Sequence, residues 1–296
     1  MKIDGVFAGG GVRAFAFIGA TQVLEERGFS FARLSGTSAG ALFSALLKAG
    51  YTSHELNDLM NELNVAEFMD GRKTLLPFKW MKWIQLYFNL GMYKGDKLEQ
   101  WISEKLEKKG VKTFADLPEG SLKIIASDLT KGRILVLPDD LPTYGLIPEK
   151  FSVARAVRMS SSIPYFFEPV KVYDPSGRKS YIVDGGVLSN FPLWVFMREL
   201  NQKLPRPVLG FRLTPNVNEI PPNEIHNAID MFQSLFETMR KAHDVRYIIE
   251  EHAKNIVFIP VEDVKATDFD LSEEKKEALI LLGRERTEKF LKKWVY

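Results

Sequence analysis

The 296-residue sequence predicts an α/β fold with a central, mostly parallel sheet, and two observations support this prediction. First, short apolar runs alternate with helical stretches: a run at 2–8, a helix at 12–27 and a second run at 31–35. Second, each run leads into a glycine-rich turn directly before a helix, as expected when parallel strands are joined through helices.

Caps, turn residues and apolar runs predict the remaining elements in order. Thr52 and Glu55 have the spacing of a capping box, which begins a helix ending near residue 63. The turn Asp174-Pro175-Ser176-Gly177 joins a hairpin, and Ser272 caps the last helix. Strands are expected at 122–127, 133–137, 170–173, 181–183, 207–213 and 255–260, and helices at 96–109, 151–160, 223–253 and 273–294. A single domain over 1–296, with a C-terminal helical extension at 223–296, is the simplest account.

The composition excludes several classes of function. The 40 basic and 38 acidic residues give a net charge of +2, so no strong field favours nucleic acid. The absence of cysteine excludes disulfides, thiolate metal sites and cysteine nucleophiles. No signal peptide and no run of 18 apolar residues is recognised, so a cytoplasmic location is the default expectation.

The segment 34–40 contains the pattern Gly36-x-Ser38-x-Gly40 between a predicted strand and an apolar helix. This is the context of a nucleophile elbow, in which a serine sits on a sharp turn and its neighbours must lack bulk. The N-terminus of the following helix favours negative charge beside such a serine. The alternative is a Gly/Ser turn in which Ser38 simply caps the helix.

The loop after the first strand contains Gly9-Gly10-Gly11 followed by Val12 and Arg13. Three glycines allow backbone N–H groups to converge without side chains in the way, which suits an oxyanion hole beside a serine nucleophile. Arg13 would orient the loop or add positive charge. The alternative is the dinucleotide fingerprint Gly9-x-Gly11-x-x-Ala14, but the acidic residue that should end the second strand is missing.

Asp184 ends an apolar strand and is followed by Gly185 and Gly186, so its carboxylate can approach a partner closely. The alternative is an ordinary Asp-Gly turn. No histidine lies at a strand end or in a glycine-rich loop, because all four fall in predicted charged helices: His54, His226, His243 and His252. A dyad in which the carboxylate accepts the serine proton therefore fits better than a Ser-His-Asp triad.

Together these motifs resemble the patatin-like phospholipases. The glycine-rich loop at 9–13, the elbow at 36–40 and Asp184-Gly185-Gly186 occur in the family's order, and the segments 158–170 and 187–192 are similar to two further family blocks. The resemblance spans roughly residues 3–215 and implies a three-layer sandwich around the sheet. One departure is Ala14, where the family usually has glycine; its methyl group crowds the helix start slightly.

The resemblance implies a lipid acyl hydrolase acting on phospholipids or lysophospholipids, without metal or cofactor. Ser38 would be the nucleophile and Asp184 the base. The oxyanion would be held by N–H groups of the loop and elbow, with these residues forming the hole: Gly9, Gly10, Gly11, Arg13 and Ala39. Two other classes stay open: a non-catalytic module that binds lipid or nucleotide, and a nicotinamide-dependent oxidoreductase.

The segment 64–95 contains an aromatic stretch at 74–92 with two lysines. On a helix, Trp80, Trp83 and Tyr87 share one face, while Lys79 and Lys82 share another. Such a helix suits a membrane interface, so we expect a lid over Ser38 and transient, peripheral contact with a lipid surface. The alternative is an ordinary helix that packs these aromatic rings into the core.

Overall fold

The computed structural model describes residues 1–62, 65–71, 86–197, 205–213, 254–261 and 270–295, together with residues 225, 231, 234, 238, 264, 266 and 268. Several sequence predictions fall outside these residues. They are most of the expected helix at 223–253, the greater part of the aromatic stretch with Trp80 and Trp83, and His226, His243 and His252.

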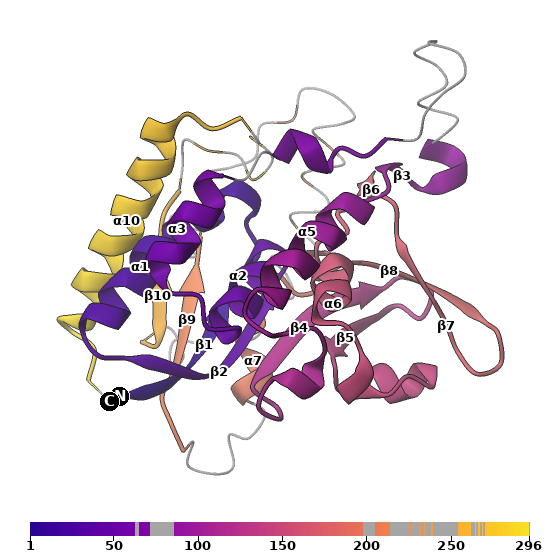
Figure 1. Ribbon diagram of the computed structural model, residues 1–296. Coiled ribbons are helices and arrows are strands. Elements are labelled where there is room, and N and C mark those ends of the chain that lie inside the picture. Colours follow the sequence, from indigo (N-terminus) through magenta and orange to yellow (C-terminus); the bar gives the residue numbers. More distant parts are fainter. Residues whose placement is uncertain are drawn as a thin grey trace.

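The predicted central sheet is confirmed. Within the described residues it has eight strands, in the order β10-β9-β1-β2-β4-β8-β7, with β5 paired to β4 (Figure 1). The five strands from β10 to β4 are parallel to one another, whereas β8 and β5 run antiparallel to β4. The strand bounds are β1 Lys2–Phe7, β2 Ser30–Thr37, β4 Leu122–Asp128, β5 Arg133–Leu137, β7 Val170–Tyr173, β8 Lys179–Asp184, β9 Val208–Arg212 and β10 Ile256–Phe258.

A separate two-stranded parallel ribbon pairs β3, Gly91–Tyr93, with β6, Tyr165–Phe167. It lies to the right in Figure 1, close to the N-terminal end of α5. The short strand β3 begins at Gly91, close to the end of the aromatic stretch 74–92, and residues 86–89 just before it are helical.

Two helices, α3 and α10, begin at the caps that the sequence predicts, and α6 begins at a serine cap that it did not predict. Thr52 and Glu55 form the complete capping box of α3, and Ser152 and Ser272 accept hydrogen bonds from backbone N–H groups at the starts of α6 and α10. The expected helix over 12–27 differs slightly, because it opens with a 3-10 turn at Gly11–Ala14. The helix bounds are α1 Phe15–Glu26, α2 Ala39–Lys48, α3 Ser53–Asn61, α5 Asp96–Glu107, α6 Val153–Ser160, α7 Trp194–Met197 and α10 Glu273–Leu291.

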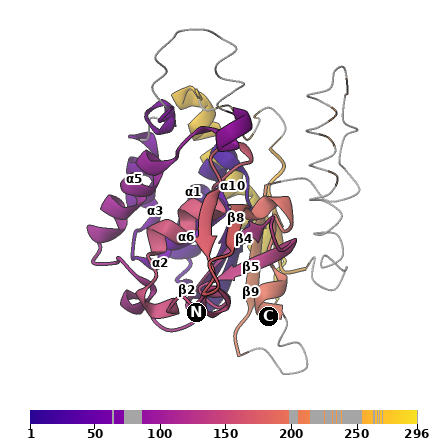
Figure 2. The ribbon, with the colours of Figure 1, turned by 90° about the vertical axis from the view of Figure 1, so that its right-hand side faces the viewer.

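Hydrophobic cores cover both faces of the sheet. Along β1, Ile3 and Phe7 join the larger core, which also takes side chains from α1, α2, α5 and α6. Val6, which points to the opposite face, joins a smaller core with Phe196 of α7. Figure 2 shows the helices of the larger core together on one side of the sheet. The sheet therefore forms the central layer, as predicted.

The C-terminal helix α10 packs directly on α1 (Figure 1). Glycines make this contact close: a Cβ atom on Gly283 would lie 1.8 Å from the carbonyl oxygen of Ala16, and one on Gly19 would lie 1.8 Å from that of Ile280. Arg284 and Glu26 add an ion pair between the two helices. The last helix thus supports the helix that follows the glycine-rich loop.

Strand register places the ends of β2 and β8 at the same level on either side of β4. Thr37 pairs with Ile125 in parallel, so Ser38 lies level with Ala126, and Ala126 pairs directly with Asp184. The two backbones are therefore about two strand spacings, roughly 10 Å, apart. Two side chains pointing toward each other can bridge that distance.

Candidate active site

Ser38 connects β2 to α2 through a sharp turn. Its φ of 55° and ψ of −124° are unusual for a residue with a side chain. The flanking glycines are required sterically, because a Cβ atom on Gly36 would lie 2.2 Å from the carbonyl oxygen of Gly40, and one on Gly40 would lie 2.3 Å from that of Phe7. The turn therefore has the geometry of a nucleophile elbow at a helix N-terminus.

The hydroxyl of Ser38 donates a hydrogen bond to the carboxylate of Asp184, with 2.6 Å between Oγ and Oδ2. The other carboxylate oxygen, Oδ1, accepts from the N–H of Gly186 at 2.7 Å. Asp184 is only 5% exposed, so its carboxylate is largely shielded from water, whereas Ser38 is half-buried. The turn after Asp184 packs closely against β4 because residue 185 is a glycine: a Cβ atom there would lie 2.2 Å from the carbonyl oxygen of Ile125. The two residues singled out in the sequence are thus in direct contact.

The one histidine among the described residues lies on α3. The side chain of His54 is 87% exposed and faces Asp58 on the same helix, with 3.1 Å between Nδ1 and Oδ2. Ser38 and Asp184 come from β2 and β8 instead.

The glycine-rich loop lies against the elbow, since a Cβ atom on Gly9 would be 3.3 Å from that of Ser38. Its backbone N–H groups differ in whether they already have a hydrogen-bond acceptor. The N–H of Gly9 donates to the carbonyl of Asn190 at 2.9 Å, so it is already occupied. Within the described residues, the N–H groups of Gly10 and Gly11 have no acceptor. The Nε of Arg13 donates to the carbonyl of Gly10 at 3.3 Å, which orients the loop.

At the elbow, the N–H groups of Ser38 and Ala39 also differ. The N–H of Ser38 donates to the hydroxyl of Ser160 at 2.9 Å, whereas that of Ala39 has no acceptor among the described residues. The backbone N–H of Arg13 donates to the carbonyl of Gly10 at 3.3 Å. Of the five residues that the sequence assigned to the oxyanion hole, Gly10, Gly11 and Ala39 therefore have N–H groups left for a ligand, whereas those of Gly9 and Arg13 are occupied.

Two residues that hold these loops together were not recognised from the sequence. The side-chain amide of Asn190 donates to the carbonyl of Gly9 at 3.2 Å, which ties the segment after Asp184 to the glycine-rich loop. Ser160 accepts from Ser38 across 122 residues. Both lie in segments similar to family blocks, which was the available signal, but a single sequence does not reveal which atoms they contact.

The described residues contain no group of three or more histidine, aspartate or glutamate side chains placed to hold a metal ion. They also contain no helix that is both long and apolar enough to cross a membrane.

Comparison with known proteins points to one family. A family model described as patatin-like phospholipase matches residues 5–197. YqhO of Bacillus subtilis (strain 168) is 53% identical over 296 residues, which cover all of both chains. The probable lipid hydrolase 463L of Invertebrate iridescent virus 6 is 23% identical over 210 residues, covering 67% of this chain and 64% of that protein.

Among solved structures, VipD from Legionella pneumophila has a similar fold, with a TM-score of 0.56 at 18% sequence identity. The match covers 99% of this chain and 67% of that one. It shows that the sheet and its flanking helices form a known arrangement.

Proposed function

Since the chain belongs to the patatin-like phospholipase family, we propose that it is a serine lipid acyl hydrolase working through Ser38 and Asp184. Its substrates are fatty-acyl esters of phospholipids or lysophospholipids. The observation that supports this proposal most directly is the 2.6 Å hydrogen bond between Ser38 Oγ and Asp184 Oδ2 at the N-terminus of α2.

In the acylation step, Asp184 accepts the hydroxyl proton of Ser38 while Oγ attacks the acyl carbonyl. The hydrogen bond from Gly186 to Oδ1 keeps Oδ2 turned toward the serine. The tetrahedral oxyanion is stabilised by the N–H groups of Gly10, Gly11 and Ala39 and by the positive end of the α2 dipole.

The tetrahedral intermediate then expels the alcohol, which takes the proton from Asp184. This leaves an acyl group on Ser38. Water, deprotonated by the same carboxylate, attacks this ester and releases the fatty acid, and the proton returns to Oγ. Every proton transfer runs between the reacting oxygen and one carboxylate, so the cycle requires no histidine.

The dyad is tested by two variants with a matched control. Ser38→Ala should abolish both fatty-acid release from a p-nitrophenyl ester and labelling by a fluorophosphonate probe. Asp184→Asn should lower the rate by roughly 10⁴-fold, because an amide cannot accept the proton. His54→Ala, which lies outside the site, should retain wild-type activity. Hydrolysis that persists in Ser38→Ala would refute the assignment.

We also propose that the chain meets lipid through the aromatic segment 74–92 and the ribbon beside it. In the described part of this region, large apolar side chains are exposed: Tyr87 at 78%, Phe88 at 75%, Met92 at 42% and Tyr165 at 50%. Exposed aromatic side chains suit the interface of a bilayer, where their rings insert at headgroup level.

Vesicle flotation tests this contact. The double variant Tyr87→Ala/Phe88→Ala should float less with phospholipid vesicles and lose activity on long-chain lipid, while hydrolysis of a soluble short-chain ester is retained. Tyr173→Ala, at an aromatic side chain that is 57% exposed on the β7–β8 hairpin, is the control and should behave as wild type. Equal flotation of the double variant and wild type would contradict the proposal.

A further inference from the structure

One short turn contacts the backbone of both dyad residues. It begins at the last residue of α6 and comprises Ser160, Ser161 and Ser162. The N–H of Ser38 donates to the hydroxyl of Ser160 at 2.9 Å. The N–H of Asp184 donates to the carbonyl of Ser162 at 2.8 Å. The two backbones that carry the nucleophile and the carboxylate are therefore held by residues only two positions apart.

A second contact of the Ser160 hydroxyl decides that it acts as an acceptor toward Ser38. It donates to the carbonyl of Ile125 in β4 at 2.5 Å, so its lone pairs are left for the N–H of Ser38. Ser160 is fully buried, so these bonds are shielded from bulk solvent. Because Ile125 is also the β-sheet partner of Thr37, this hydroxyl joins the central strand to the elbow.

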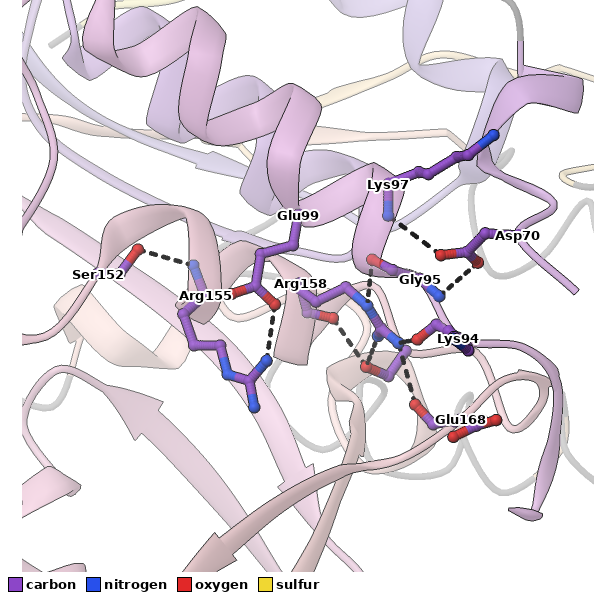
Figure 3. A network of polar contacts seen from close by, with 10 residues as sticks. Asp70, Lys94, Gly95, Lys97, Glu99, Ser152, Arg155, Arg158 and Glu168 are labelled. Carbon is purple, nitrogen blue, oxygen red and sulfur yellow. Dashed lines mark hydrogen bonds and ion pairs between the residues drawn. The ribbon is translucent and has the colours of Figure 1, made fainter. Parts of the chain in front are cut away.

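A buried arginine, Arg158, donates hydrogen bonds both to the turn and to two other segments (Figure 3). Arg158 is 2% exposed, and its Nη1 donates to the hydroxyl of Ser162, which in turn donates to the carbonyl of Arg158 at 2.7 Å. Its Nε donates to the carbonyl of Gly95 at 2.9 Å, and its Nη2 donates to the carbonyls of Lys94 and Glu168. Burial lowers the pKa of this guanidinium to about 10. Neutral oxygens on three segments thus fix the arginine, and through it the turn.

We propose that Ser160 is a positioning residue for the dyad: its hydroxyl holds the peptide before Ser38 so that Oγ stays within hydrogen-bond distance of Asp184. The backbone of Ser38 has a φ of 55°, a conformation that is held only if its surroundings impose it. Without an acceptor for its N–H, that peptide can rotate, and Oγ moves away from Oδ2. This inference rests on the proposed function, because its consequence is a slower chemical step.

The test replaces the hydroxyl in graded steps. Cysteine is a weak hydrogen-bond acceptor of similar shape, and alanine has no acceptor, so Ser160→Cys and Ser160→Ala form a series. The control is Ser152→Ala at the other end of the same helix, where the hydroxyl accepts from the N–H of Arg155. Its loss removes an N-cap and therefore lowers the melting temperature without contacting the dyad.

Each protein is assayed on a soluble short-chain ester, and the rate is divided by the number of sites titrated to completion with a fluorophosphonate. We expect kcat per titrated site to fall by about 10²-fold in Ser160→Ala, and by less in Ser160→Cys, because a small misplacement of reacting groups costs about that much. The KM should stay nearly unchanged, since the hydroxyl does not contact substrate. Ser152→Ala should keep the wild-type kcat per site.

Wild-type kcat per titrated site in Ser160→Ala, with only a lower melting temperature, would overturn the inference. If Ser160→Ala does not fold, Ser160→Cys decides: a reduced kcat per site at a near-normal melting temperature supports positioning, and an unchanged one refutes it. A wild-type protein that neither hydrolyses ester nor reacts with the probe would refute the proposed function itself, and the inference with it.

Discussion

The backbone conformation of Ser38 predicts that Ser38→Gly is more stable than Ser38→Ala, the reverse of the usual order. Both variants lose the hydroxyl and its hydrogen bond to Asp184, so that loss cancels between them. They differ in the Cβ atom alone. At a φ of 55° and a ψ of −124°, this atom is strained in alanine, whereas glycine adopts such angles freely.

Two opposing terms set the magnitude. A residue held in a sparsely populated backbone region costs about 1–3 kcal/mol, which glycine avoids. Glycine in turn loses more conformational entropy on folding, by about 0.5–1 kcal/mol. The difference favours Ser38→Gly by about 1 kcal/mol, which for a chain of this size raises the melting temperature by about 2–4 °C.

Urea and thermal denaturation of the two variants measure this difference. The control pair is Ser103→Gly and Ser103→Ala in α5, where the backbone is helical and alanine should be the more stable by about 1 kcal/mol. A Ser38→Gly variant no more stable than Ser38→Ala, while the Ser103 pair shows its normal order, would contradict this prediction. That result would mean that the elbow relaxes to an ordinary conformation.

Two further predictions concern stability away from the elbow. The Tyr144 hydroxyl donates to the buried carboxylate of Asp128 at 2.5 Å, and burial, reinforced by that bond, raises the pKa of Tyr144 to about 12. Because the folded state holds this proton more tightly than the unfolded one, its contribution is present below pH 10 and is lost between about pH 10 and 12, up to about 2 kcal/mol. Urea denaturation should show that the free energy of unfolding of wild type falls over this pH range and that of Tyr144→Phe does not. The same dependence of the unfolding free energy on pH in both proteins would refute the assignment. Gly283→Ala should destabilise by about 1–3 kcal/mol although alanine normally favours a helix, because its Cβ atom would lie 1.8 Å from the Ala16 carbonyl oxygen. A variant more stable than wild type would show that α10 does not pack so closely on α1.

The sequence by itself determined the local features of this protein. The glycines around Ser38 and after Asp184 identified the elbow and the carboxylate turn, because sharp backbone turns demand residues without side chains. Caps such as Thr52 and Ser272 located helix starts for a similar reason, since a cap satisfies backbone groups within a few residues of itself.

Only the tertiary structure decided which distant groups meet. Strand register put Ser38 and Asp184 on either side of Ala126, and no pattern in either segment encodes that pairing. The same holds for Ser160, whose partner is 122 residues away, and for the N–H of Gly9, which the sequence assigned to the oxyanion hole but which the carbonyl of Asn190 occupies. A hydrogen bond forms only where a donor and an acceptor come within about 3 Å in a suitable orientation, and the packing of the whole chain sets both.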